Sequence, residues 1–80
     1  PGHILVQGGV LLDDINQYIA IGNHGHDVQT VGGLVMAELG RRPYQADEIT
    51  LGEVTLRVEA VERLSVSQVS VLLPPALSAL

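Results

Sequence analysis

The sequence predicts an α+β fold, a small two-layer sandwich in which two helices cover one face of a mainly antiparallel sheet. Three observations lead to it. The chain has 80 residues, enough for one domain. Apolar residues recur at helical spacing in the first half of the chain and alternate with polar residues in the second half. One strand, two helices and a late run of strands follow in that order, which is typical of this class.

The first elements are a strand, a turn and a helix. The aliphatic run His3–Gln7 ends at Gly8 and Gly9 and predicts a strand followed by a turn. We expect a helix over residues 10–20. Residues 22–27 are rich in Gly, Asn and His, and this composition predicts a loop. The apolar residues that define the helical stripe are Leu11, Leu12, Ile15, Tyr18 and Ile19.

A second helix is predicted to begin near Thr30, a residue type that caps helix N-termini. Gly32 and Gly33 each cost the helix about 1 kcal/mol relative to Ala, so we expect close packing there. Gly40 is the expected left-handed end of the helix, and Pro43 prevents its continuation. The apolar stripe consists of Val31, Leu34, Val35 and Leu39.

The last part of the chain predicts three strands. Residues 48–51 alternate up to Gly52, and residues 53–62 alternate with one buried and one solvated face. A turn near 63–65 leads to residues 66–72, whose imperfect pattern indicates either a bulge or burial on both faces. The three strands should form a meander.

The domain is expected to span residues 1–73, with 74–80 as a C-terminal tail, because two prolines end the last strand. Since Pro1 is not a natural start, we expect the chain to be a piece of a longer protein.

Composition excludes several classes of function. The net charge is −5 and the chain lacks Lys, which argues against binding nucleic acid or an anionic membrane surface. The absence of Cys excludes disulfides and thiolate metal sites. No apolar run reaches the roughly 18–20 residues that span a bilayer, so this segment should not insert into a membrane.

Three motifs in order resemble the CorC/HlyC transporter-associated domain. They are the LDDIN of residues 12–16, the DVQTVGGLVMAELGRRP of 27–43 and the DEI of 47–49. Their order and spacing agree over residues 4–72. The chain departs from the family pattern mainly in its turns, where Ala46 replaces the usual Gly and residues 63–65 lack the usual Asp-Gly.

The resemblance implies a setting and a function. Such domains lie at the cytoplasmic C-terminus of membrane proteins that carry a transmembrane domain and a nucleotide-binding CBS pair, and are linked to magnesium and cobalt efflux or labelled hemolysins. Their fold is similar to part of a flavin-binding architecture. The resemblance implies a non-catalytic domain without a cofactor. Such a domain modulates transport through contacts with the CBS pair, the transmembrane domain or a second copy. The alternative is a module that binds a small molecule, a nucleotide or a flavin.

Two clusters are candidate functional sites. His24 and His26 form an H-x-H with Asp27 adjacent, a donor set suited to a divalent metal, but a flexible polar loop explains the same residues. Arg41 and Arg42 are the only basic doublet; they could contact an acidic partner or a phosphate, or complement the helix dipole.

The other chemistry-bearing residues are interpreted as structural. Asp13 and Asp14 point about 100° apart on a helix, so they complement its dipole and do not form one acid/base or cation site. The two glycine pairs fit no phosphate-binding motif. Three serines have no His or Asp partner in their sequence context: Ser65, Ser67 and Ser70. The sequence therefore predicts no enzyme.

Overall fold

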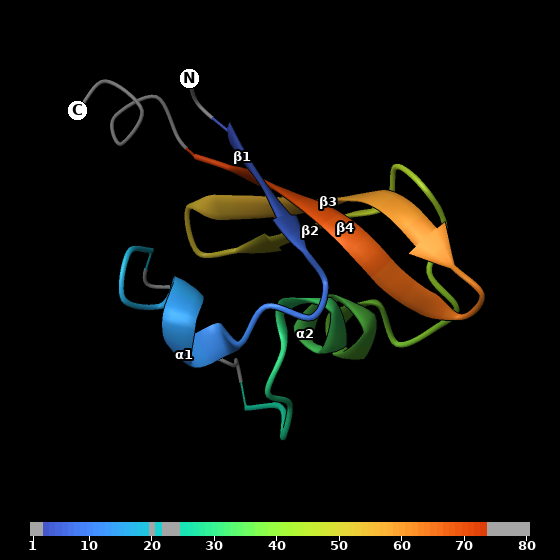
Figure 1. The fold of residues 1–80 in the computed structure, drawn as a ribbon, viewed down its shortest axis with the longest axis horizontal. Coiled ribbons are helices and arrows are strands. Elements are labelled where there is room, and N and C mark those ends of the chain that lie inside the picture. The colour runs from blue at the N-terminus through green and yellow to red at the C-terminus, as the bar shows by residue number, and fades with distance from the viewer. Residues whose placement is uncertain (1–2, 20, 22–24, 74–80) are drawn as a thin grey trace.

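Four strands and two helices make up the fold, in the order β1, α1, α2, β2, β3, β4 (Figure 1). The structure is a computed structural model that describes residues 3–19, 21 and 25–73. The four strands form one antiparallel sheet with the spatial order β1-β4-β3-β2. The elements are β1 His3–Gln7, α1 Leu12–Ile15, α2 Val31–Leu39, β2 Glu48–Leu51, β3 Val54–Glu62 and β4 Ser65–Leu72. The predicted α+β class and the late three-stranded meander are confirmed.

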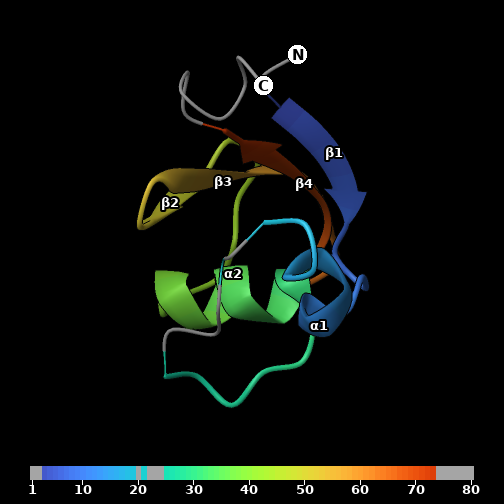
Figure 2. The ribbon, with the colours of Figure 1, turned by 90° about the vertical axis from the view of Figure 1, so that its left-hand side faces the viewer.

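The two helices lie on the same face of the sheet, which gives the two expected layers (Figure 2). The core between the layers is aliphatic, and its fully buried side chains come from α2 and the two central strands: Val31, Leu34, Val35, Leu56, Val58, Val69 and Val71. No helix in the described part of the chain is long and apolar enough to cross a membrane. No helix of the described residues covers the opposite face of the sheet (Figure 2).

Helix α2 begins and ends where the sequence predicts. The Thr30 hydroxyl accepts a hydrogen bond from the backbone N–H of Gly33 at 3.1 Å and caps the N-terminus. Gly40 closes the C-terminus in the left-handed conformation, with φ 66°, and its N–H donates to the carbonyl of Met36. Of the apolar stripe, Val31, Leu34 and Val35 are fully buried, and Leu39 is partly buried against the core.

The first helix is much shorter than the expected residues 10–20. It is capped by Leu11, which offers no side-chain hydrogen bond, and it ends before Asn16. The Asn16 carboxamide oxygen accepts the N–H of Ile21 at 2.7 Å and turns the chain back on itself. Tyr18 is consequently 84% exposed, and only part of the predicted stripe, including Leu12 and Ile15, reaches the core.

Two glycines bring three segments into backbone contact. Gly8, directly after β1, donates its N–H to the Ser67 carbonyl and accepts the N–H of Gly32, each at 2.9 Å. A Cβ on Gly32 would lie 3.0 Å from the carbonyl oxygens of both Gly8 and Val66. The close packing expected for Gly32 is therefore confirmed, and it joins the start of α2 to β1 and β4.

The pairing of β3 with β4 contains a bulge. Val58 pairs with Val69 and Ala60 pairs with Gln68, so Glu59 is an extra residue on β3. Beside the bulge, residues 69–71 of β4 are buried on both faces, and the hydroxyl-bearing Ser70 is only 3% exposed. Both explanations considered for the imperfect pattern of residues 66–72 hold.

Candidate interaction surface on the open sheet face

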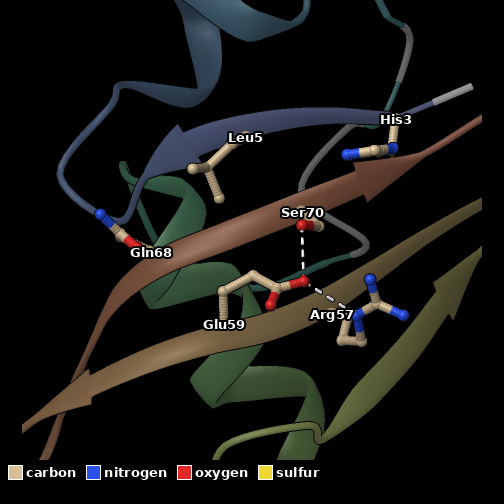
Figure 3. Close-up of a pocket in the computed structure, with 6 residues that line it drawn as sticks. All are labelled: His3, Leu5, Arg57, Glu59, Gln68 and Ser70. Carbon is tan, nitrogen blue, oxygen red and sulfur yellow. Dashed lines mark hydrogen bonds and ion pairs between the residues drawn. The ribbon is translucent and has the colours of Figure 1, made fainter. Parts of the chain in front are cut away.

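A polar hollow lies on the sheet face that the helices leave uncovered (Figure 3). Its volume is about 380 Å³. Three neighbouring strands contribute its lining, two residues from each: His3 and Leu5 of β1, Gln68 and Ser70 of β4, Arg57 and Glu59 of β3. We call these six residues the open-face site.

The centre of the open-face site is the carboxylate of Glu59. Its Oε2 atom accepts the Ser70 hydroxyl at 2.6 Å and the Nε–H of Arg57 at 2.9 Å. The hydrogen bond from Ser70, followed by that from Arg57, holds the pKa of Glu59 below its ordinary value. The same bond to Glu59 raises the pKa of Arg57 above its ordinary value. The ion pair is thus charged and fixed in place at neutral pH.

The β-bulge explains why these side chains converge. Arg57 lies directly opposite Ser70 in the ladder, and Glu59 is the unpaired residue two positions further along β3. Side chains two residues apart share a face of a strand, so the Glu59 side chain can reach across to β4 and contact Ser70. Bulges often re-aim side chains in this way. The partner of Ser70, eleven residues earlier in the chain, was missed from the sequence because the contact depends on how β3 and β4 pair.

The chemistry of the open-face site favours recognition over reaction. The Ser70 hydroxyl is nearly inaccessible, and its proton is directed at a carboxylate whose pKa is lowered, which makes Glu59 a weak base. The terminal nitrogens of Arg57 are less tightly paired than its Nε atom, because Nη1 lies 3.9 Å from Oε2 of Glu48. Leu5 adds an apolar side chain that is 56% exposed. A fixed ion pair beside exposed apolar surface can bind a polar or charged group of another molecule.

The basic doublet has two different environments. Arg41 forms a bidentate pair with Asp47, with Nη1–Oδ2 and Nη2–Oδ1 distances of 3.0 and 2.8 Å, and Asp47 also accepts the Tyr44 N–H. The hydrogen bond from Arg41, then that from Tyr44, lowers the pKa of Asp47. Arg41 therefore closes the turn between α2 and β2. Arg42 lies 5.9 Å from the centroid of the Tyr44 ring, and its role in binding a partner stays a prediction.

The candidate metal loop is described only in part. His24 lies outside the described residues. The Nε2 atom of His26 lies 2.9 Å from Oε2 of Glu38 on α2. Within residues 3–19, 21 and 25–73, no three His, Cys, Asp or Glu side chains gather in a metal-binding group. A metal role for His24, His26 and Asp27 stays a prediction.

Known structures show the same fold. A transporter-associated domain of a CBS domain protein from Porphyromonas gingivalis is 21% identical, with a TM-score of 0.80 over 90% of this chain and 88% of that one. A hemolysin domain from Enterococcus faecalis is 27% identical, with a TM-score of 0.79 over 90% and 88%. A region associated with a putative Mg²⁺ and Co²⁺ transporter (CorC) from Neisseria meningitidis is 19% identical, with a TM-score of 0.81 over 91% and 90%.

The family assignment comes from the sequence match. Comparison with curated proteins finds no match. The model of the CorC_HlyC family, the transporter associated domain, matches residues 1–75, which include every element of the fold and all six residues of the open-face site. The chain therefore belongs to the CorC/HlyC family of transporter-associated domains.

Proposed function

We propose that this chain is a non-catalytic accessory domain at the cytoplasmic face of a membrane ion-transport protein, and that it modulates transport through protein–protein contacts. The contact surface is the open-face site, which faces the CBS pair or the transmembrane domain of the parent protein. The single observation that supports this choice is the Glu59 carboxylate, which is held by Ser70 and Arg57 on a face that no helix covers. Membership of the transporter-associated family supports the setting.

A fixed ion pair suits such a contact for a physical reason. Binding normally costs free energy to order flexible charged side chains, and Arg57 and Glu59 are already ordered by each other and by Ser70. Electrostatic complementarity then selects the partner surface and its orientation. To modulate transport, the contact has to differ between two conformational states of the parent protein, because a contact that is equal in both shifts no equilibrium.

The experiment compares two single substitutions in the full-length parent protein reconstituted into liposomes. Glu59→Gln removes the charge at the centre of the open-face site, whereas Glu62→Gln removes the same charge at the exposed end of the same strand. We expect Glu59→Gln to change how ion flux depends on the nucleotide that binds the CBS pair, while the parent still assembles. Glu62→Gln should behave as wild type. Equal behaviour of both variants and the wild type would contradict the proposal.

The alternative of a nucleotide or flavin module lacks a specific supporting observation. Flavin and adenine rings are commonly held by aromatic or apolar walls. Neither tyrosine lines the open-face site: Tyr18 lies in the turn after α1 and Tyr44 in the turn before β2. Calorimetric titration with flavins and adenine nucleotides tests this alternative, and a saturable heat signal would revive it.

A further inference from the structure

Strand β1 leaves one edge of the sheet without a partner. Among residues 3–19, 21 and 25–73 it is the end strand of the sheet and pairs only with β4 (Figure 2). Its sequence, HILVQ, contains no carboxylate, no Lys or Arg and no Pro. Ile4 and Leu5 are 43% and 56% exposed. Natural edge strands usually carry charges, prolines or bulges that prevent pairing with another strand, and β1 has none of these protections.

The opposite edge of the sheet is protected. Strand β2 has four residues and begins with Glu48, and the ion-paired Asp47 precedes it directly. Two copies of a chain with a net charge of −5 repel each other in general, and carboxylates on an edge strand add to that repulsion. Of the two edges, β1 is therefore the one at which a second copy can approach.

The ladder shows which backbone groups of β1 point outward. Gly8 donates its N–H to the carbonyl of Ser67, and Gln7 is the residue that pairs with Gln68. In an antiparallel ladder, hydrogen-bonded and non-hydrogen-bonded pairs alternate. The backbone N–H and C=O groups of Ile4 and Val6, and the N–H of Gly8, therefore point toward β4. Both groups of His3 and Leu5 and the N–H of Gln7 point toward the free edge, whereas the Gln7 carbonyl accepts the N–H of Val10 at 3.1 Å in the turn after β1.

We propose that two copies of this chain pair through their β1 strands, antiparallel, with the two-fold axis at Leu5. In this register each Leu5 exchanges both backbone hydrogen bonds with the partner's Leu5. On either side, the Gln7 N–H of one copy donates to the His3 carbonyl of the other. Both groups of Leu5, the His3 carbonyl and the Gln7 N–H are thereby paired, and the two sheets join into one continuous sheet.

The side chains of β1 fit the same register. Leu5 meets its own copy on the open face, next to the open-face site. Ile4 lies opposite the partner's Val6 on the helix-covered face, where both are aliphatic. A two-fold interface requires a self-complementary surface, and a strand without charges whose apolar residues are arranged symmetrically about its centre meets that requirement. The inference does not depend on the proposed function.

The size of the contact predicts a weak dimer. A single five-residue strand buries much less than the roughly 1,200 Å² of a stable standard interface, so pairing should appear at high micromolar to millimolar protein concentrations. Tethering in an assembled parent would raise the effective concentration to this range.

Cross-linking tests the register, because the chain has no native Cys. Across the proposed axis the two Leu5 Cα atoms lie about 5.5 Å apart, which a disulfide can bridge. The two Gln7 residues lie roughly 14 Å apart, beyond disulfide reach. We expect Leu5→Cys to form a disulfide-linked dimer on mild oxidation several-fold faster than Gln7→Cys. Equal rates for the two variants would overturn the proposal.

Analytical ultracentrifugation tests the pairing itself. Leu5→Pro removes an N–H that points away from β4, so the fold is retained and the dimer is lost. We expect the wild type to sediment with a concentration-dependent dimer fraction and Leu5→Pro to sediment as a monomer with an unchanged circular dichroism spectrum. A wild type that stays monomeric up to millimolar concentration would overturn the proposal, as would a Leu5→Pro variant that dimerises like the wild type.

Discussion

The backbone contact between Gly8, α2 and β4 makes a sharp prediction about two neighbouring glycines. A Cβ placed on Gly8 would overlap the carbonyl oxygen of Val66, whereas a Cβ on Gly9 would meet no atom within 4 Å. Neither glycine has a positive φ, so space and not backbone conformation separates them. Gly8→Ala should therefore destabilise the fold strongly, and Gly9→Ala should not.

The magnitude for Gly8→Ala follows from what has to move. The atoms in conflict are backbone atoms of β4, so the clash cannot be relieved by rotating a side chain. Overpacking of an interior typically costs 1–3 kcal/mol, and the upper end applies here. Displacing β4 also weakens the hydrogen bonds that Gly8 makes with Ser67 and Gly32. We expect a loss of about 3 kcal/mol or more in the free energy of unfolding.

Urea unfolding followed by far-ultraviolet circular dichroism measures the difference. A loss of about 3 kcal/mol corresponds to a fall in Tm of roughly 12 °C or more for a domain of this size. Gly9→Ala should leave stability unchanged or raise it by up to about 1 kcal/mol, because Ala has fewer unfolded conformations. Gly32→Ala gives a smaller loss, of about 1–2 kcal/mol, because helix propensity partly offsets its clash. A Gly8→Ala variant as stable as Gly9→Ala would refute the reasoning.

Three further predictions concern turns, caps and pH. Ala46 has φ 76°, which disfavours any side chain, so Ala46→Gly should stabilise the fold by about 1 kcal/mol in chemical denaturation. Ala60→Gly within β3 should destabilise the fold by a similar amount. A change in the free energy of unfolding with the same sign in both variants would contradict the argument. Thr30→Ala should cost about 1 kcal/mol by removing the cap of α2, and Thr30→Ser should restore most of it; a full loss in both variants would show that the hydroxyl is not the cause. Because the pKa of Glu59 is lowered in the folded state, its contribution to stability is present at neutral pH and lost as the pH falls below about 4. Ser70→Ala should weaken this pH dependence of the free energy of unfolding, because it removes the hydrogen bond to Glu59. An unchanged slope of unfolding free energy against pH would contradict the assigned cause.

The sequence predicts most of the fold because local signals agree with the tertiary structure. Thr30 and Gly40 mark the ends of α2 through capping preferences that depend on a few neighbouring residues. The first helix is predicted too long because the stop is a side-chain contact. Asn16 binds the N–H of Ile21, five residues later, and no periodicity in the apolar residues signals that bond.

The open-face site is less accessible to sequence reasoning. Ser70 and Glu59 meet across two paired strands, beside an extra residue in β3, and the position of a bulge is set by the pairing of both strands. The sequence marks Arg41 as a candidate contact for a partner, which stays a prediction, and its ion pair with Asp47 is found only when the turn between α2 and β2 is seen. Charges near each other in the sequence do not reveal which of them remain available to a partner.

We propose that this domain regulates transport and does not carry it out. The most direct measurement is ion flux through the full-length parent in liposomes, with and without the segment that corresponds to residues 1–73. We expect the shortened parent still to conduct ions but to respond differently to the nucleotide that binds its CBS pair. A parent whose flux and assembly are unchanged without the segment, or whose flux is abolished while it still assembles, would contradict the account.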